Sequence, residues 1–227
     1  MSNAQATRIA IDSDTAVSAL LDRPDAPQAG YVFAHGAGAG MTHPFMAHAA
    51  GALGARGIAT LRYQFPYMER GSKRPDLPKV AHAAVRAAVH EAARALPALP
   101  LIAGGKSFGG RMTSQAQAAA PLSGVVGLVF LGFPLHAAGK PSIERAQHLA
   151  SIKIPMLFVQ GTRDEMADVS LIESTVGALG PHATLHWVHD GDHSFRVPAR
   201  SGRDPSQVLD GVFDAIQRWL ERVIEGA

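Results

Sequence analysis

The stretch LIAGGKSFGG, residues 101–110, decides the fold more than any other part of the sequence. Its first three residues are apolar and predict a buried strand, and the residues from Ser107 onward predict a helix that Pro121 stops. A serine between a strand and a helix, with a glycine two residues away on each side, is typical of a sharp, strained turn. Such a turn exposes the hydroxyl beside the free N–H groups of the first helical turn. The stretch therefore predicts a strand–turn–helix unit with an exposed serine.

Two nucleotide-binding interpretations of the glycine-rich segments do not fit the spacing. GKS at 105–107 resembles the end of a phosphate-binding loop, but that motif needs a glycine where the chain has Pro100. Gly36 and Gly38 resemble the start of a dinucleotide fingerprint, but Met41 stands in place of its third glycine. No acidic residue directly follows the next predicted strand, as that fingerprint requires. We therefore set both interpretations aside.

Predicted strands and helices alternate along the 227 residues. Apolar runs predict strands over residues 8–11, 16–21, 30–34, 58–61, 99–103, 125–131, 155–160 and 184–188. Helical periodicity and stop signals predict helices over residues 44–56, 79–96, 107–120, 141–150, 168–179 and 206–224. This alternation predicts a mostly parallel central sheet with helices on both faces, in one domain over residues 1–227. A loop is expected over residues 63–78, and residues 135–151 are the best candidate for a short cap.

The composition excludes several functional classes. The chain has no cysteine, so disulfides, a thiolate nucleophile and cysteine-bound zinc are impossible. A formal net charge of +2, with the positive residues scattered, does not favour nucleic acid as a partner. Residues 1–4 lack the pattern of a signal peptide and resemble a tag remnant, and no run approaches the ~20 apolar residues of a membrane-spanning helix. We expect a cytoplasmic protein without a membrane partner.

Two further residues, an acid and a histidine, are candidates to activate Ser107. A serine hydroxyl is a weak nucleophile until a base takes its proton, and turns of this type are followed along the chain by an acid and then a histidine. Asp164 follows the strand that ends at Gln160, and His193 lies in the loop after the last strand. The carboxyl ends of parallel strands meet at one edge of the sheet, so the three side chains are expected to converge there.

Neighbouring residues compete for the acid and base roles. Among the eleven histidines, His189 at the end of the last strand is the main alternative base, and Glu165 and Asp168 are the alternative acids. His193 is preferred because it lies after Gly191 in a flexible loop that could reach over the sheet edge. The histidines of this region show no spacing typical of a metal site, and we expect neither a metal nor a cofactor.

Backbone and side-chain groups around Ser107 are candidates for binding a substrate. An oxyanion hole needs two backbone N–H donors, and we assign the N–H of Phe108 and, from the earlier glycine-rich loop, that of Ala37. Cationic and neighbouring side chains on the loops expected to face the site are candidate substrate contacts, and so much positive charge favours an anionic substrate. With a cap of about fifteen residues, the pocket is expected to be shallow. The candidate contacts are His35, Arg62, Lys106, Phe133 and His136.

Seven segments spread over most of the chain resemble one known group of proteins. The group is that of small, dienelactone-hydrolase-like predicted α/β-hydrolases with a Gly-Lys-Ser-x-Gly-Gly elbow. The resemblance implies the α/β-hydrolase fold with a minimal cap, and it implies a catalytic triad of Ser107, Asp164 and His193. The matching segments are HGAGAG at 35–40, HPFM at 43–46, RYQFPY at 62–67, GGKSFGG at 104–110, GFPLH at 132–136, GTRD at 161–164 and DHSF at 192–195.

The expected function is hydrolysis of an ester-type bond of a small-molecule substrate, through an acyl-enzyme on Ser107. True dienelactone hydrolases use a cysteine nucleophile, so the serine here argues against assuming a lactone substrate. Some relatives of the group serve as protein-interaction modules, and a catalytically silent module is the alternative function. The sequence leaves the acyl group, the alcohol and the oligomeric state open.

Overall fold

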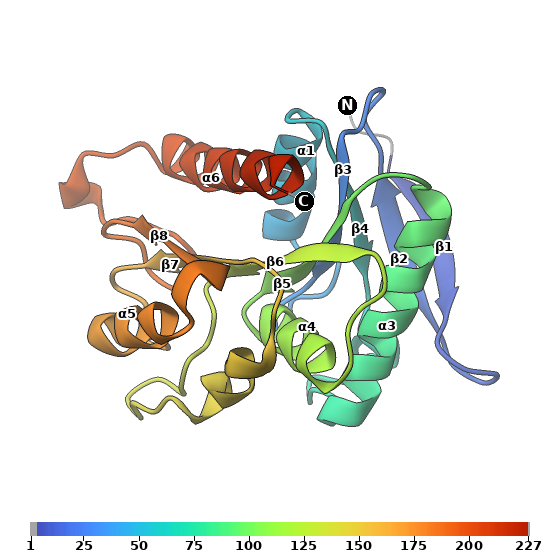
Figure 1. The fold of residues 1–227 in the computed structure, drawn as a ribbon, viewed down its shortest axis with the longest axis horizontal. Helices are drawn as coiled ribbons and strands as arrows, with labels where there is room; N and C mark the ends of the chain where they lie inside the picture. The colour runs from blue at the N-terminus through green and yellow to red at the C-terminus, as the bar shows by residue number, and fades with distance from the viewer. Residues whose placement is uncertain (1–3, 227) are drawn as a thin grey trace.

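A sheet of eight strands crosses the centre of the computed structural model, which describes residues 4–226 (Figure 1). The strands lie in the order β1-β2-β4-β3-β5-β6-β7-β8. β1 and β2 form an antiparallel hairpin, β2 pairs antiparallel with β4, and the other neighbouring pairs are parallel. Their bounds are β1 (Gln5–Ala10), β2 (Ala16–Asp22), β3 (Ala29–Ala34), β4 (Ile58–Tyr63), β5 (Leu101–Lys106), β6 (Val125–Leu131), β7 (Met156–Gly161) and β8 (Ala183–Val188).

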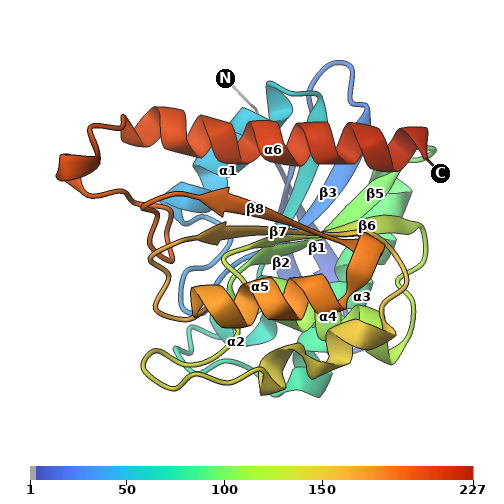
Figure 2. The same cartoon turned by 60° about the vertical axis from the view of Figure 1, so that its left-hand side comes forward.

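Helices cover both faces of this sheet, as Figures 1 and 2 show. α1 and α6 pack on one face, and α3, α4 and α5 pack on the other. The helices are α1 (Pro44–Gly54), α2 (Pro66–Glu69), α3 (Pro78–Ala95), α4 (Phe108–Ala119), α5 (Val169–Ala178) and α6 (Pro205–Glu225), with 3-10 turns η1 (Glu144–Ser151), η2 (Gly180–His182) and η3 (Ala199–Ser201). The predicted parallel sheet with two helical layers is confirmed. The expected tag remnant at 1–4 lies outside the described residues apart from Ala4.

The helical layers on both faces of the sheet explain why the central strands are continuous apolar runs in the sequence. Every residue of β3, β4 and β7 is buried, because each of these strands has a helical layer on either side. α6 buries the stripe that its periodicity predicts, including Phe213, Ile216 and Trp219. Gly127 in β6 makes room for this helix, since a Cβ there would lie 2.6 Å from the Trp219 ring. Burying each such side chain stabilises the fold by roughly 1.5–3 kcal/mol.

Several elements differ from the sequence expectations. β5 continues through Gly104 and Gly105 instead of ending at Ala103, because a Cβ at these glycines would lie 1.9 Å from Val129 O and 2.1 Å from Ala34 O. The glycines therefore allow close strand approach at the centre of the sheet. The expected loop at 63–78 contains the short helix α2, and the helix expected at 141–150 is the 3-10 segment η1. Within the described part of the chain, no helix has both the length and the apolar character to cross a bilayer.

Candidate active site

Ser107 occupies a strained turn between β5 and α4. Its φ of +49° and ψ of −114° are unusual for a residue with a side chain, and such strain is held only where the surroundings enforce it. The neighbouring glycines explain how the turn fits. A Cβ at Gly109 would lie 2.6 Å from the backbone oxygens of both Ala34 and His35, and one at Gly110 would lie 2.8 Å from Gly105 O. The elbow therefore packs directly on the backbone of β3 and the loop that follows it.

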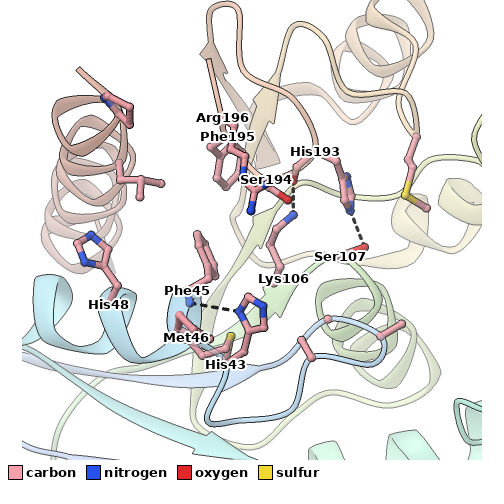
Figure 3. A pocket seen from close by; sticks show the side chains of 17 residues that line it. His43, Phe45, Met46, His48, Lys106, Ser107, His193, Ser194, Phe195 and Arg196 are labelled. Atoms are coloured by element: carbon pink, nitrogen blue, oxygen red, sulfur yellow. Dashed lines mark hydrogen bonds between the residues drawn. The ribbon is translucent and has the colours of Figure 1, made fainter. Parts of the chain in front are cut away.

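Ser107, His193 and Asp164 form a continuous chain of hydrogen bonds at the carboxyl edge of the sheet. His193 Nε2 lies 2.8 Å from Ser107 Oγ, and His193 Nδ1 lies 2.7 Å from Asp164 Oδ2. Figure 3 shows the imidazole pointing at the serine hydroxyl. The Asp164 side chain has no exposed surface, while that of His193 is 26% exposed. A carboxylate on Nδ1 favours the tautomer with its proton on Nδ1, which leaves Nε2 free to accept the serine proton.

Gln160, which sequence reasoning missed, holds the carboxylate in place. Its Nε2 donates to Asp164 Oδ2 at 2.5 Å, and its Oε1 accepts the N–H of Phe133 at 2.9 Å. The N–H of Met166 donates to the other carboxylate oxygen at 2.8 Å. Gln160 is fully buried at the end of β7, four residues before Asp164. A buried glutamine so close to a candidate acid was the available signal, because buried amides need hydrogen-bond partners.

The competing residues lie away from Ser107. His189 and Glu165 are exposed. Asp168 caps α5, where its Oδ1 accepts hydrogen bonds from the Ser170 hydroxyl and from the N–H of Leu171. The structure thus brings His193 and Asp164 to the serine and none of the three alternatives.

His35 shapes the loop that supplies the second candidate oxyanion donor. Its Nδ1 donates to Gly36 O at 2.8 Å, and its Nε2 accepts the N–H of Phe65 at 3.1 Å. Burial lowers the pKa of His35 to about 4, so the ring is neutral at physiological pH and can play both roles. The bond to Gly36 O orients the trans peptide that carries the Ala37 N–H, which points away from that oxygen. The other candidate, the N–H of Phe108, belongs to the first turn of α4, where N–H groups lack helical partners.

A cavity of about 710 Å³ opens beside Ser107 (Figure 3). Its walls come from the loop after β3, from α1, from the loop after β8 and from the start of α6, and they are largely apolar. Lys106 and Arg196 are the charged residues of its lining, which contains no carboxylate. α1 and α6 supply walls of this cavity, which the expectation of a shallow pocket did not take into account.

The comparison with known proteins agrees with this architecture. A family model described as an alpha/beta hydrolase domain matches residues 27–221. The chain belongs to this family. Three solved α/β-hydrolase structures are similar to it over nearly their whole length. They are a dienelactone hydrolase from Anabaena variabilis (TM-score 0.75, 19% identity, 97% of this chain and 98% of that chain), a serine hydrolase without lid from Xanthomonas campestris (0.73, 22%, 95% and 94%) and an esterase domain of a Rhodothermus marinus protein (0.73, 15%, 97% and 98%).

Of the five candidate substrate contacts in this α/β-hydrolase, Lys106 alone lines the cavity beside Ser107. His35 and Phe133 are fully buried. Arg62 is also buried, and its guanidinium donates to Asp22 Oδ2 at 2.8 and 3.1 Å and to Met41 O. The expected unbalanced charge at Arg62 is therefore absent, because a carboxylate from β2 neutralises it.

His136 and the expected cap do not line the cavity beside Ser107. His136 lines a smaller cavity of about 410 Å³, where its Nε2 accepts the N–H of Asp168. In residues 135–151, η1 packs against α4 and buries Ala146 and Leu149. No residue of this segment lines the cavity beside Ser107. Among the residues that the structure describes, no group of three or more His, Asp or Glu side chains is arranged to hold a metal ion.

Proposed function

We propose that this α/β-hydrolase cleaves the ester or thioester bond of a small substrate, with Ser107 as nucleophile, His193 as general base and Asp164 as the acid that orients the histidine. The observation that carries the proposal is the hydrogen-bond chain of 2.8 and 2.7 Å from Ser107 through His193 to Asp164, beside a cavity of about 710 Å³. The strained backbone of Ser107 supports it further, since such strain is concentrated at active sites.

The geometry supports a two-step acyl transfer. Ser107 Oγ attacks the substrate carbonyl carbon while His193 Nε2 takes the serine proton, and the buried Asp164 carboxylate stabilises the imidazolium. The N–H groups of Ala37 and Phe108 would bind the negative oxygen of the tetrahedral intermediate. The imidazolium then gives its proton to the departing alkoxide or thiolate. Water next attacks the acyl-enzyme, His193 takes the water proton, and that proton finally returns to Ser107.

The lining of the cavity favours a substrate with an apolar part and a polar or anionic group. Phe45, Met46, Phe195 and Leu209 supply apolar wall, and Arg196 adds a positive charge to a lining that contains no carboxylate. A cation in a partly enclosed cleft raises the local concentration of an anionic ligand, and it does so less as salt increases.

Covalent labelling tests the proposal. A fluorophosphonate probe should label the wild-type chain, and Ser107→Ala should not be labelled. Ser114→Ala is the matched control, because Ser114 is buried on α4 and hydrogen-bonds to His148 instead of His193. p-Nitrophenyl esters and thioesters, each paired with a carboxylate-bearing isostere at low and high salt, then define the substrate class. Undiminished labelling of Ser107→Ala would remove this serine from the mechanism, and a wild-type chain that neither reacts nor turns over would favour the silent interaction module.

A further inference from the structure

Lys106 joins the two segments that carry the reacting side chains. It ends β5 directly before Ser107, and its Nζ donates a hydrogen bond to the backbone carbonyl oxygen of His193 (Figure 3). The same ammonium lies 5.2 Å from the centre of the Phe195 ring. Both contacts fall on the loop that follows β8. In the sheet, β6 and β7 lie between β5 and β8, so no strand ladder joins the elbow directly to this loop.

The space around this contact is kept open by a glycine. Gly132 follows β6 with a φ of +67°, a conformation that favours glycine. A Cβ at this position would lie 2.7 Å from Lys106 Nζ and 3.2 Å from the carbonyl oxygen of His193. The ammonium and its acceptor therefore occupy room that a side chain at 132 would close.

We propose that Lys106 is a positioning residue that ties the His193 loop to the nucleophile turn, and that the Ser107–His193 hydrogen bond depends on this tie with the lysine charged. The inference rests on the proposed function, since the geometry of His193 matters most if this ring takes the serine proton. Lys106 acts here through the backbone of His193 and needs no contact with the substrate. A charged donor makes the bond to a carbonyl roughly twice as strong as a neutral donor would.

The environment of the ammonium makes its charge sensitive to pH near the physiological range. Burial lowers the pKa of Lys106 to about 8, and the negative charges of Asp164 and Asp192 oppose this effect. A neutral His193 ring adds no charge next to the Lys106 ammonium. Arg196 is the other charged residue of the cavity lining. Below pH 8 the tie is charge-assisted, and above it a neutral amine makes a weaker bond. Reactivity of Ser107 should therefore fall above about pH 8.

Phosphorylation of the serine by diethyl p-nitrophenyl phosphate measures this directly. The reagent is small and neutral, and Ser107 Oγ displaces p-nitrophenolate from phosphorus, so absorbance gives the rate. We expect the rate of the wild-type chain to fall above about pH 8. Lys106→Met should react about tenfold or more slowly at pH 7.5, the order expected for loss of one charge-assisted hydrogen bond, and should show no fall above pH 8.

Lys153→Met is the matched control. Lys153 is exposed and donates to a backbone carbonyl, that of Ala150, at 3.4 Å, so the change removes the same kind of bond away from the site. This variant should keep the wild-type rate and profile. A wild-type profile without a fall above pH 8, or a Lys106→Met variant with the wild-type rate and profile, would overturn the proposal. So would a Lys106→Met variant that raises KM for p-nitrophenyl acetate with kcat unchanged, since this would make Lys106 a substrate contact.

Hydrogen exchange separates this inference from the proposed function. Amide exchange of residues 189–204, followed by mass spectrometry on the full chain, should be several-fold faster in Lys106→Met than in the wild-type and Lys153→Met chains. Equal exchange in all three would overturn the tie even if Ser107 proved reactive. A wild-type chain that does not react with the phosphate ester would refute the proposed function, while the exchange rates would still decide whether Lys106 holds the loop.

Discussion

Replacing Asp164 with asparagine is expected to leave the chain folded and to slow turnover by ~10⁴-fold, the loss measured for the same change in chymotrypsin-type enzymes. The Asp164 carboxylate accepts hydrogen bonds on both oxygens: Oδ2 from His193 Nδ1 and Gln160 Nε2, and Oδ1 from the N–H of Met166. An amide has one oxygen where the carboxylate has two. If its NH₂ group faces His193, the imidazole must present a lone pair at Nδ1 and carry its proton on Nε2. That tautomer cannot accept the serine proton.

The two effects of this substitution differ in size. A 10⁴-fold loss corresponds to about 5.4 kcal/mol in the activation barrier. The folded state loses less, because one mismatched buried group costs ~1–3 kcal/mol, and an ordinary domain has ~5–15 kcal/mol of unfolding free energy. Turnover should therefore collapse while thermal unfolding stays cooperative, with a lower Tm.

Steady-state kinetics with p-nitrophenyl acetate provide the assay, with thermal unfolding by circular dichroism on the same samples. Glu165→Gln is the matched control, since it makes the same chemical change on an exposed neighbour and should alter kcat by less than about twofold. A larger loss in Glu165→Gln than in Asp164→Asn would shift the acid by one residue. Wild-type kcat in Asp164→Asn would refute the argument from tautomers.

His193→Ala should remove nearly all turnover of p-nitrophenyl acetate. His189→Ala should keep most of it, because the His189 side chain is exposed and lies outside the cavity lining. The opposite ranking of the two kcat values would move the general base to His189. The free energy of unfolding should fall as pH drops from 6.5 towards 4. Burial lowers the folded-state pKa of both His35 and His148 to about 4. The unfolded chain therefore binds more protons than the folded chain in this pH range. Urea unfolding should show a loss of ~2 kcal/mol from His35 alone by pH 4.5, so His35→Gln should reduce this dependence and leave the part due to His148. An unfolding free energy equal at pH 7 and pH 4.5 in the wild-type chain would contradict the prediction.

The parts of the fold that follow from local pattern could be predicted from the sequence. The apolar stripe of α6 shows helical periodicity in the sequence, and the wholly buried strands show continuous apolar runs. The hairpin of β1 and β2 follows from turn residues between two short strands. The turn at Ser107 could also be predicted from the sequence, because such a strained turn needs glycine at fixed offsets from the serine. Its glycines 105 and 109 face backbone oxygens at distances that admit no side chain.

The environment of charged residues could not be predicted in the same way. Arg62 was expected to face the substrate, yet it pairs with Asp22, forty residues earlier and on the neighbouring strand β2. The register that sets Leu20 opposite Arg62 and Asp22 opposite Thr60 comes from the pairing of β2 with β4, which no local pattern reports. Buried charges need partners, so a cation within a predicted core strand implies a hidden carboxylate nearby even when the sequence does not identify it.

The walls of the cavity could not be predicted from the sequence for a related reason. A cap was expected at 135–151, but the walls come from α1 and the start of α6, two elements of the core fold separated by some 150 residues of chain. Both helices pack on the same face of the sheet, and each extends to its carboxyl edge, where the loop that carries His193 lies. The cavity beside Ser107 therefore needs no inserted lid to form its walls. Changes that reshape the substrate range should concentrate on Phe45 and Leu209 in these helices, and not on residues 135–151.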